Sequence, residues 1–160
     1  MMMKILQNAG QKVVFLLAIS VSMFILLPAL AYEGLEYLGY EIIFGKELLN
    51  INPFNLGSLA SAELPLSVMA FLAFFLPLVA GIIALSSKRY LFISLIIFTV
   101  SLFLLWTLPN YIDIVYTVAG NESTANVDWA KSIGLIGAFV TTSVAALLNL
   151  ILVLTPPAKQ

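Results

Sequence analysis

The chain has 160 residues, of which 62% are hydrophobic and only 9% are charged. Soluble globular domains carry about one quarter charged residues, so a water-soluble fold of this size could not bury so much apolar surface. Cysteine and histidine are both absent, which excludes disulfides, thiolate or imidazole metal ligands and catalysts of these two types. The composition predicts an integral membrane protein.

Four uncharged apolar stretches are each long enough to cross the roughly 30 Å hydrocarbon core of a bilayer as a helix. Helices are expected because unpaired backbone groups are costly in lipid and the alternation of a membrane β-barrel is absent. The sequence therefore predicts an all-α membrane protein, a single domain over residues 1–160 with a bundle of four transmembrane helices. The predicted spans are 13–31, 64–86, 90–108 and 132–154, and the outer segments are 32–63 and 110–131.

The first span has a second interpretation. A basic start, an apolar run and Ala29-Leu30-Ala31 together also resemble a signal peptide with its cleavage site. The apolar run is longer than the usual core of a signal peptide, which favours a retained helix. Cleavage would leave three spans with the same orientation.

The positions of the basic residues predict the orientation, because short cytoplasmic loops retain Lys and Arg. One side of the membrane carries five basic residues, whereas the other carries two lysines among eight acidic residues, a net charge of −6. We therefore predict a multi-pass protein of the cell membrane whose N- and C-termini are both cytoplasmic. The basic residues on the predicted inner side are Lys4, Lys12, Lys88, Arg89 and Lys159.

The first outer segment is too rich in apolar residues for a free loop, and we expect a small folded cap or β-sheet on the membrane surface. Within it, residues 40–44 lie between two glycines and predict a short strand, although Leu35, Leu38 and Ile42 would also suit an interfacial helix. In the second outer segment, Gly120-Asn121 marks a turn. Aromatic residues near the outer ends of the spans are typical of a membrane interface: Tyr32, Trp106, Tyr111 and Trp129.

This layout resembles that of small bacterial tetraspan membrane proteins, whose arrangement is similar to that of claudins. The resemblance depends on the glycine-flanked element 39–45, the basic connection Lys88-Arg89 and a tryptophan before the last span. It implies a left-handed four-helix bundle with a small outer sheet. The paired cysteines and the Trp-Gly-Leu-Trp type of signature found in claudins are missing here, so the resemblance implies no junction or paracellular-pore function.

Small side chains recur at the helical period in two spans, as close approach of helices in lipid requires. We expect these residues to pack inside one bundle; the alternative is an interface with a second copy or a partner. The third span carries bulky residues, including Phe92, Phe98 and Phe103, and is expected to face lipid or a partner. The predicted packing residues are Ala70, Ala73, Pro77, Gly81, Ala84, Gly134, Ala138, Thr142 and Asn149.

Polar groups within the spans need hydrogen-bond partners. Pro77 frees a carbonyl one turn earlier, near Ala73, and is expected to kink its helix; a static kink is favoured over a hinge for gating. Asn149 is expected to bond to another helix, with a substrate or ion contact as the alternative. The span hydroxyls are expected to bond to carbonyls of their own helices: Ser20, Ser22, Ser94, Thr99 and Ser101.

Four outer carboxylates lie close together in the sequence: Glu33, Glu36, Glu41 and Glu47. They predict a solvated acidic outer surface that repels anionic headgroups or attracts a basic partner. The alternative is a set of oxygen ligands for calcium, although the spacing of a known calcium loop is absent.

The sequence indicates no cofactor, metal or nucleic-acid site and no enzyme, because acids, bases and nucleophiles are missing from membrane depth. The predicted function is that of an accessory, scaffolding or assembly subunit, which contacts the lipid bilayer and another membrane protein or further copies of itself. The alternative is a pore- or channel-forming homo-oligomer with an acidic outer mouth.

Overall fold

The computed structural model describes residues 2–51 and 60–155, so Lys159 of the orientation argument lies outside the described residues. Within these ranges, four helices are long and apolar enough to cross a membrane, over Gln7–Leu26, Val68–Ser86, Lys88–Tyr111 and Ile133–Leu154. This confirms the prediction of four helices with the length and composition of membrane spans. The long α-helices are α1 (Met2–Met23), α3 (Val68–Ser86), α4 (Leu91–Thr107) and α5 (Ile133–Leu154).

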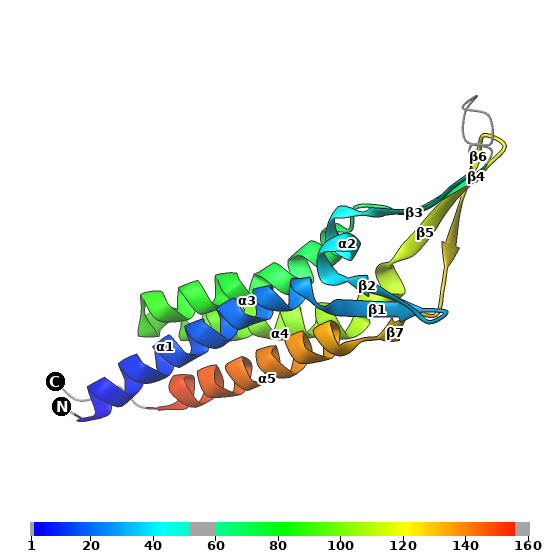
Figure 1. The fold of residues 1–160 in the computed structure, drawn as a ribbon. Coiled ribbons are helices and arrows are strands. Elements are labelled where there is room, and N and C mark those ends of the chain that lie inside the picture. The colour runs from blue at the N-terminus through cyan, green and yellow to red at the C-terminus, as the bar shows by residue number, and fades with distance from the viewer. Residues whose placement is uncertain (1, 52–59, 156–160) are drawn as a thin grey trace.

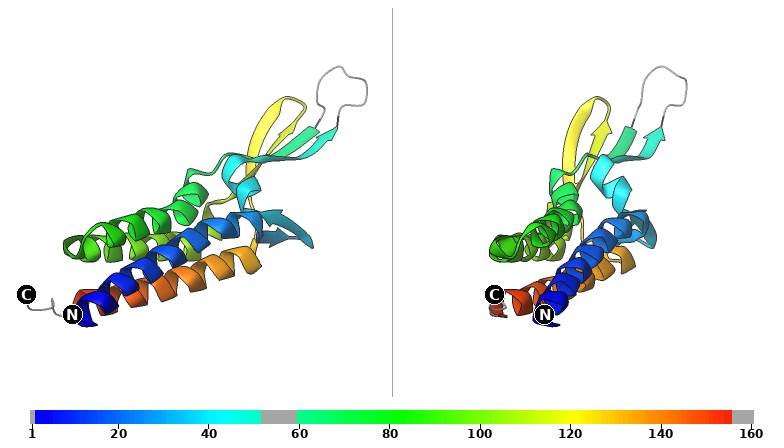
Figure 2. Two further views of the ribbon diagram at one scale, coloured as in Figure 1. Left: turned by 60° about the vertical axis from the view of Figure 1, so that its left-hand side comes forward. Right: turned by 90° about the vertical axis from the view of Figure 1, so that its left-hand side faces the viewer.

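The four long helices form an elongated bundle (Figures 1 and 2). α1 packs against α3 and α5, and α4 packs against the same two helices, so the cyclic order is α1, α3, α4, α5. The start of α1, the short 3-10 helix η2 (Lys88–Tyr90) and the end of α5 lie at one end of the bundle, where the Lys88 ammonium donates a hydrogen bond of 2.8 Å to the Thr155 carbonyl. All the strands lie beyond the opposite end, so the bundle separates a strand-bearing end from a basic end.

The first span ends earlier than predicted. α1 continues as a 3-10 turn, η1 (Phe24–Leu26), and the chain then becomes extended at Leu27 and enters strand β1 (Pro28–Tyr32). Pro28 explains this boundary, because proline disfavours helical backbone in the preceding residue. Residues 28–31 are therefore strand and not helix, and cleavage after Ala31 would cut that strand and remove α1 from the bundle.

A three-stranded antiparallel sheet lies at the strand-bearing end of the bundle, in the order β2 (Leu35–Leu38), β1, β7 (Ala130–Lys131). The turn between β1 and β2 uses Glu33 and Gly34, both with positive φ. Gly134, in the first turn of α5, lies directly against this sheet, and a Cβ atom there would lie 2.7 Å from the Pro28 carbonyl oxygen. Glycine thus permits the close contact between α5 and β1.

A larger antiparallel sheet, here called the outer sheet, projects away from the bundle (Figure 1). It pairs strands from both outer segments, so the description of the fold as all-α is wrong for the part outside the spans. β5 and β6 form a hairpin whose turn, Ala119-Gly120, confirms the turn expected there within one residue. The strand order is β3 (Lys46–Ile51), β4 (Ala60–Leu64), β5 (Asp113–Val118), β6 (Asn121–Asn126).

The element predicted as a strand at residues 40–44 is instead a short helix, α2 (Gly39–Phe44). Gly39, Ile42 and Ile43 are buried, and their spacing of three and four residues puts them on one helical face. The Glu41 carboxylate also accepts a hydrogen bond of 3.0 Å from the Leu38 backbone N–H, which caps the helix. Leu35 and Leu38 lie in β2, so the alternative of a single interfacial helix is also wrong.

Trp129 does not belong to an interfacial belt, because its side chain is buried. Its indole N–H donates a hydrogen bond of 2.7 Å to the Ile112 carbonyl, and its ring meets the rings of Tyr32 and Tyr37 at 5.7 and 5.4 Å between centroids. It thereby joins the small sheet to the chain that leads from α4 into β5. Trp106 and Tyr111, by contrast, are exposed near the outer end of α4.

Candidate functional site

The predicted packing residues of the second span all lie on the buried side of α3. Gly81 makes the closest contact, because a Cβ atom there would lie 2.5 Å from Cβ of Ala18 in α1. In α5, Gly134, Ala138, Thr142 and Asn149 are likewise buried. The structure therefore places both stripes inside a single bundle.

The third span is less uniformly lipid-facing than its sequence indicates. Phe98 is fully buried in the bundle, whereas Phe92 and Phe103 are exposed. Its buried stripe also contains Ser94 and Ser101, which give this helix a polar contact with α3.

Two of the span serines bond between helices, contrary to the expectation of bonds within their own helices. Ser101 donates a hydrogen bond of 3.0 Å to the carbonyl of Ala73, the group that Pro77 leaves without its helical partner. Ser94 similarly donates to the Ala80 carbonyl at 2.8 Å. Ser20 and Thr99 bond within their helices as expected, and the buried Ser22 hydroxyl has no partner among the described residues.

Asn149 lies fully buried between α5 and α4. Its amide donates to the Leu91 carbonyl at 3.0 Å and to the Ser94 hydroxyl at 3.2 Å, which are contacts between helices. Gln11 of α1 donates to the Ala84 carbonyl of α3 at 2.8 Å. Gln11 thus links α1 to α3 and Asn149 links α5 to α4, both near the basic end of the bundle, while the buried Oδ1 of Asn149 has no partner among the described residues.

The four outer carboxylates separate in the structure. Glu33 occupies the β1–β2 turn, Glu36 accepts a hydrogen bond of 3.2 Å from the Ser132 hydroxyl, and Glu47 lies in β3. Among the described residues, no three acidic side chains gather in a group that could hold a metal ion. The calcium alternative therefore has no geometric support.

Glu41 is the most enclosed of these four acids and forms an ion pair with Lys46, with 2.7 Å between carboxylate oxygen and ammonium nitrogen. Burial alone would raise the pKa of Glu41, but the hydrogen bonds from Lys46 and from the Leu38 N–H outweigh it, and the pKa is lowered. The same hydrogen bond raises the pKa of Lys46. This pair stabilises the junction of α2 and β3 and is not available to a ligand.

The outer sheet has two chemically different faces. Directly paired residues share a face and neighbours along a strand alternate, so the register assigns each side chain. On one face the register aligns Leu49 with Ala62 and Tyr116, and Ile51 with Ala60 and Val118. We call these six residues the apolar face; the edge strand β6 adds two polar residues beside it on the same side, Asn121 next to Val118 and Ser123 next to Tyr116. Leu49, Ile51, Tyr116 and Val118 are 39–53% exposed, so this face is open to solvent.

The opposite side, which we call the polar face, is hydrophilic apart from Val115. Glu47 and Glu63 lie directly opposite each other, a like-charge pair that destabilises a sheet unless water or a cation screens it. The remaining members of the polar face are Asn50, Ser61, Asp113, Thr117, Glu122, Thr124 and Asn126. Sequence reasoning missed this division, because the pairing of β4 with β5 joins segments more than fifty residues apart.

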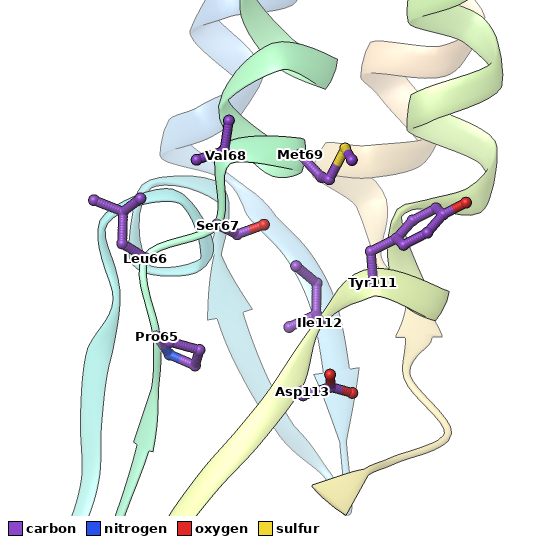
Figure 3. Close-up of a pocket in the computed structure, with 8 residues that line it drawn as sticks. All are labelled: Pro65, Leu66, Ser67, Val68, Met69, Tyr111, Ile112 and Asp113. Atoms are coloured by element: carbon purple, nitrogen blue, oxygen red, sulfur yellow. The ribbon is translucent and has the colours of Figure 1, made fainter. Parts of the chain in front are cut away.

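A pocket of about 220 Å³ lies where the outer sheet meets the bundle (Figure 3). Its two walls are the passage from β4 into α3, residues 65–69, and the passage from α4 into β5, residues 111–113. The polar groups in the lining serve the fold: Ser67 caps α3 by accepting from the Ala70 N–H, and Asp113 accepts from the Asn126 amide at 2.9 Å. We therefore assign no chemistry to this pocket.

No family model matches the sequence, and neither a curated protein nor a solved structure matches it.

Proposed function

We propose that this protein is a non-enzymatic accessory, scaffolding or assembly subunit that binds another membrane protein through the apolar face of its outer sheet. The observation that carries the proposal is the exposure of Leu49, Ile51, Tyr116 and Val118 on one side of a sheet whose other side is polar. Contiguous exposed apolar surface bordered by polar residues is typical of protein interfaces.

Charge supports a partner with basic groups at the edge of its contact surface. The predicted outer segments carry a net charge of −6. Of their two lysines, Lys46 is paired with the Glu41 carboxylate, whereas Lys131 lies over the ring of Trp106 and keeps its charge. The negative charge of this region would favour encounter with a basic partner.

The bundle of a single chain does not support the alternative of a pore. Its interior is filled by fully buried side chains, including Phe74, Phe98 and Leu105. The buried polar residues of the spans are Gln11, Ser94, Ser101, Thr142 and Asn149, none of them ionisable. Since an ion in such a bundle would meet a high desolvation barrier, a pore would require a lumen between several copies.

We further propose that the sheets face outward and that the termini are cytoplasmic. In intact cells, an impermeant thiol reagent should label Asn121→Cys, which lies exposed in β6, and should leave the exposed Ser86→Cys at the basic end unlabelled. The absence of native cysteine removes background labelling. Permeabilised cells provide the control, in which both variants should react. Labelling of Ser86→Cys alone in intact cells would reverse the orientation.

Copurification of matched variants in mild detergent tests the docking proposal. Leu49→Glu places a charge on the apolar face, whereas Asn50→Glu places the same charge on the polar face of the same strand. A stoichiometric partner should copurify with the unmodified protein and with Asn50→Glu, and its yield should fall at least about tenfold with Leu49→Glu, a loss of about 1.4 kcal/mol. Equal recovery with both variants would contradict docking at this face. Unchanged thermal stability of Leu49→Glu would exclude misfolding as the cause of any loss.

A further inference from the structure

A narrow groove of about 70 Å³ runs between α4 and α5 at the strand-bearing end of the bundle, on a surface separate from the outer sheet. Its lining is apolar apart from the side chain of Lys131. The lining consists of Leu105, Trp106, Lys131, Leu135, Ile136 and Phe139.

The ammonium group of Lys131 is held against Trp106, which also lines this groove. It lies 3.3 Å from the centroid of the Trp106 ring, and that ring lies 5.4 Å from the ring of Phe139. The Lys131 backbone pairs with Leu30 in the three-stranded sheet, which fixes the root of the side chain. The cation is therefore positioned before any ligand arrives.

The charge of Lys131 is not neutralised by the protein. Within residues 2–51 and 60–155 the only ion pair joins Lys46 and Glu41. Glu36 belongs to the same small sheet, where it pairs with Ala31, whereas Lys131 pairs with Leu30. Because neighbouring residues of a strand point to opposite faces, Glu36 and Lys131 lie on opposite faces of this sheet. A held cation beside an aromatic ring thus remains available to an anion.

The position of the groove near the membrane interface suits the anionic headgroup of a lipid. Trp106 is 60% exposed one residue before the end of α4, which is the depth at which tryptophan marks a membrane interface. Ile136, one turn deeper along α5, is exposed as well. Below the cation the groove therefore opens to hydrocarbon, and above it lies the level of the lipid headgroups.

We infer that this groove binds an anionic phospholipid of the leaflet nearest the sheets, with the phosphate on Lys131 and an acyl chain against Leu135, Ile136 and Phe139. The bilayer lipid fits better than free phosphate, because the lining offers one cation and an otherwise apolar wall. This inference does not depend on the docking function proposed above.

Tryptophan fluorescence tests the inference, because the chain contains only Trp106 in the groove and the buried Trp129. The protein is reconstituted in vesicles of phosphatidylcholine and phosphatidylglycerol in which one lipid at a time carries brominated acyl chains that quench nearby indoles. Quenching should show about a fivefold preference for phosphatidylglycerol, the effect of one lysine near an anionic headgroup. Lys131→Gln should abolish the preference and Lys131→Arg should retain it.

Several quenching results would contradict lipid binding in this groove. Equal quenching of the unmodified protein by both lipids would overturn the inference, as would a preference that survives in Lys131→Gln. Trp106→Phe measures the contribution of Trp129, and quenching undiminished in this variant would mean that the signal does not come from the groove. Lys131→Arg keeps the test valid if Lys131→Gln fails to fold, because a folded Lys131→Arg protein without any preference would by itself refute a site built on this cation.

Discussion

Replacing Trp129 by alanine is expected to lower the free energy of unfolding by about 3–5 kcal/mol, the usual cost of removing a large buried aromatic side chain. The side chain is only 7% exposed, and its N–H donates to the Ile112 carbonyl at 2.7 Å. Its loss would leave a cavity against Tyr32 and Tyr37 and an unpaired carbonyl, so the small sheet would detach from the chain entering the outer sheet.

Trp106→Ala is the matched control, because the other tryptophan of the chain is 60% exposed. We expect this variant to lose about 1 kcal/mol or less. Unfolding of both variants by SDS in mixed micelles, followed by circular dichroism, measures the difference. Similar losses for the two tryptophans would contradict the buried position assigned to Trp129.

Replacing Gly81 by leucine should separate α1 from α3 and cost about 3 kcal/mol or more. Even the first added carbon would lie 2.5 Å from Cβ of Ala18 and 3.4 Å from Cα of Phe15, so the backbones must move apart. The substitution keeps the span apolar, and insertion into the membrane should be unaffected. The defect is therefore one of helix packing and not of topology.

Val79→Leu, on the exposed side of the same helix, provides the control. It adds apolar volume toward lipid and should change the thermal stability in detergent little. If Gly81→Leu proved as stable as Val79→Leu, the face of α3 that contacts α1 would have to be rotated.

The number of membrane helices could be predicted from sequence, but their boundaries could not all be predicted. The apolar run continues through Ala29 and Leu30, and hydropathy alone does not distinguish a buried strand from the last turn of a span. Pro28 was the available signal, because it forces the preceding residue out of helical backbone. The helix at residues 39–44 was missed for a related reason. In an element of only six residues, a helical spacing of the apolar residues is difficult to distinguish from the alternation of a strand.

The two faces of the outer sheet lay beyond sequence reasoning for a different reason. The alternation of Ile114, Tyr116 and Val118 is interrupted by Val115, so one strand alone does not indicate which side is polar. The division appears only when β5 is paired with β4, a contact between the two outer segments that no local pattern specifies. Likewise, Ser94 and Ser101 could not be assigned partners in α3 without the rotation of both helices.

Site-specific photocross-linking in living cells tests the docking account most directly. A photoreactive amino acid is placed at Tyr116 on the apolar face or at Thr117, its neighbour on the polar face. The account predicts a discrete adduct with a different membrane protein from position 116, and little or none from position 117. No adduct from position 116, equal adducts from both positions, or an adduct containing only two copies of this chain would contradict it.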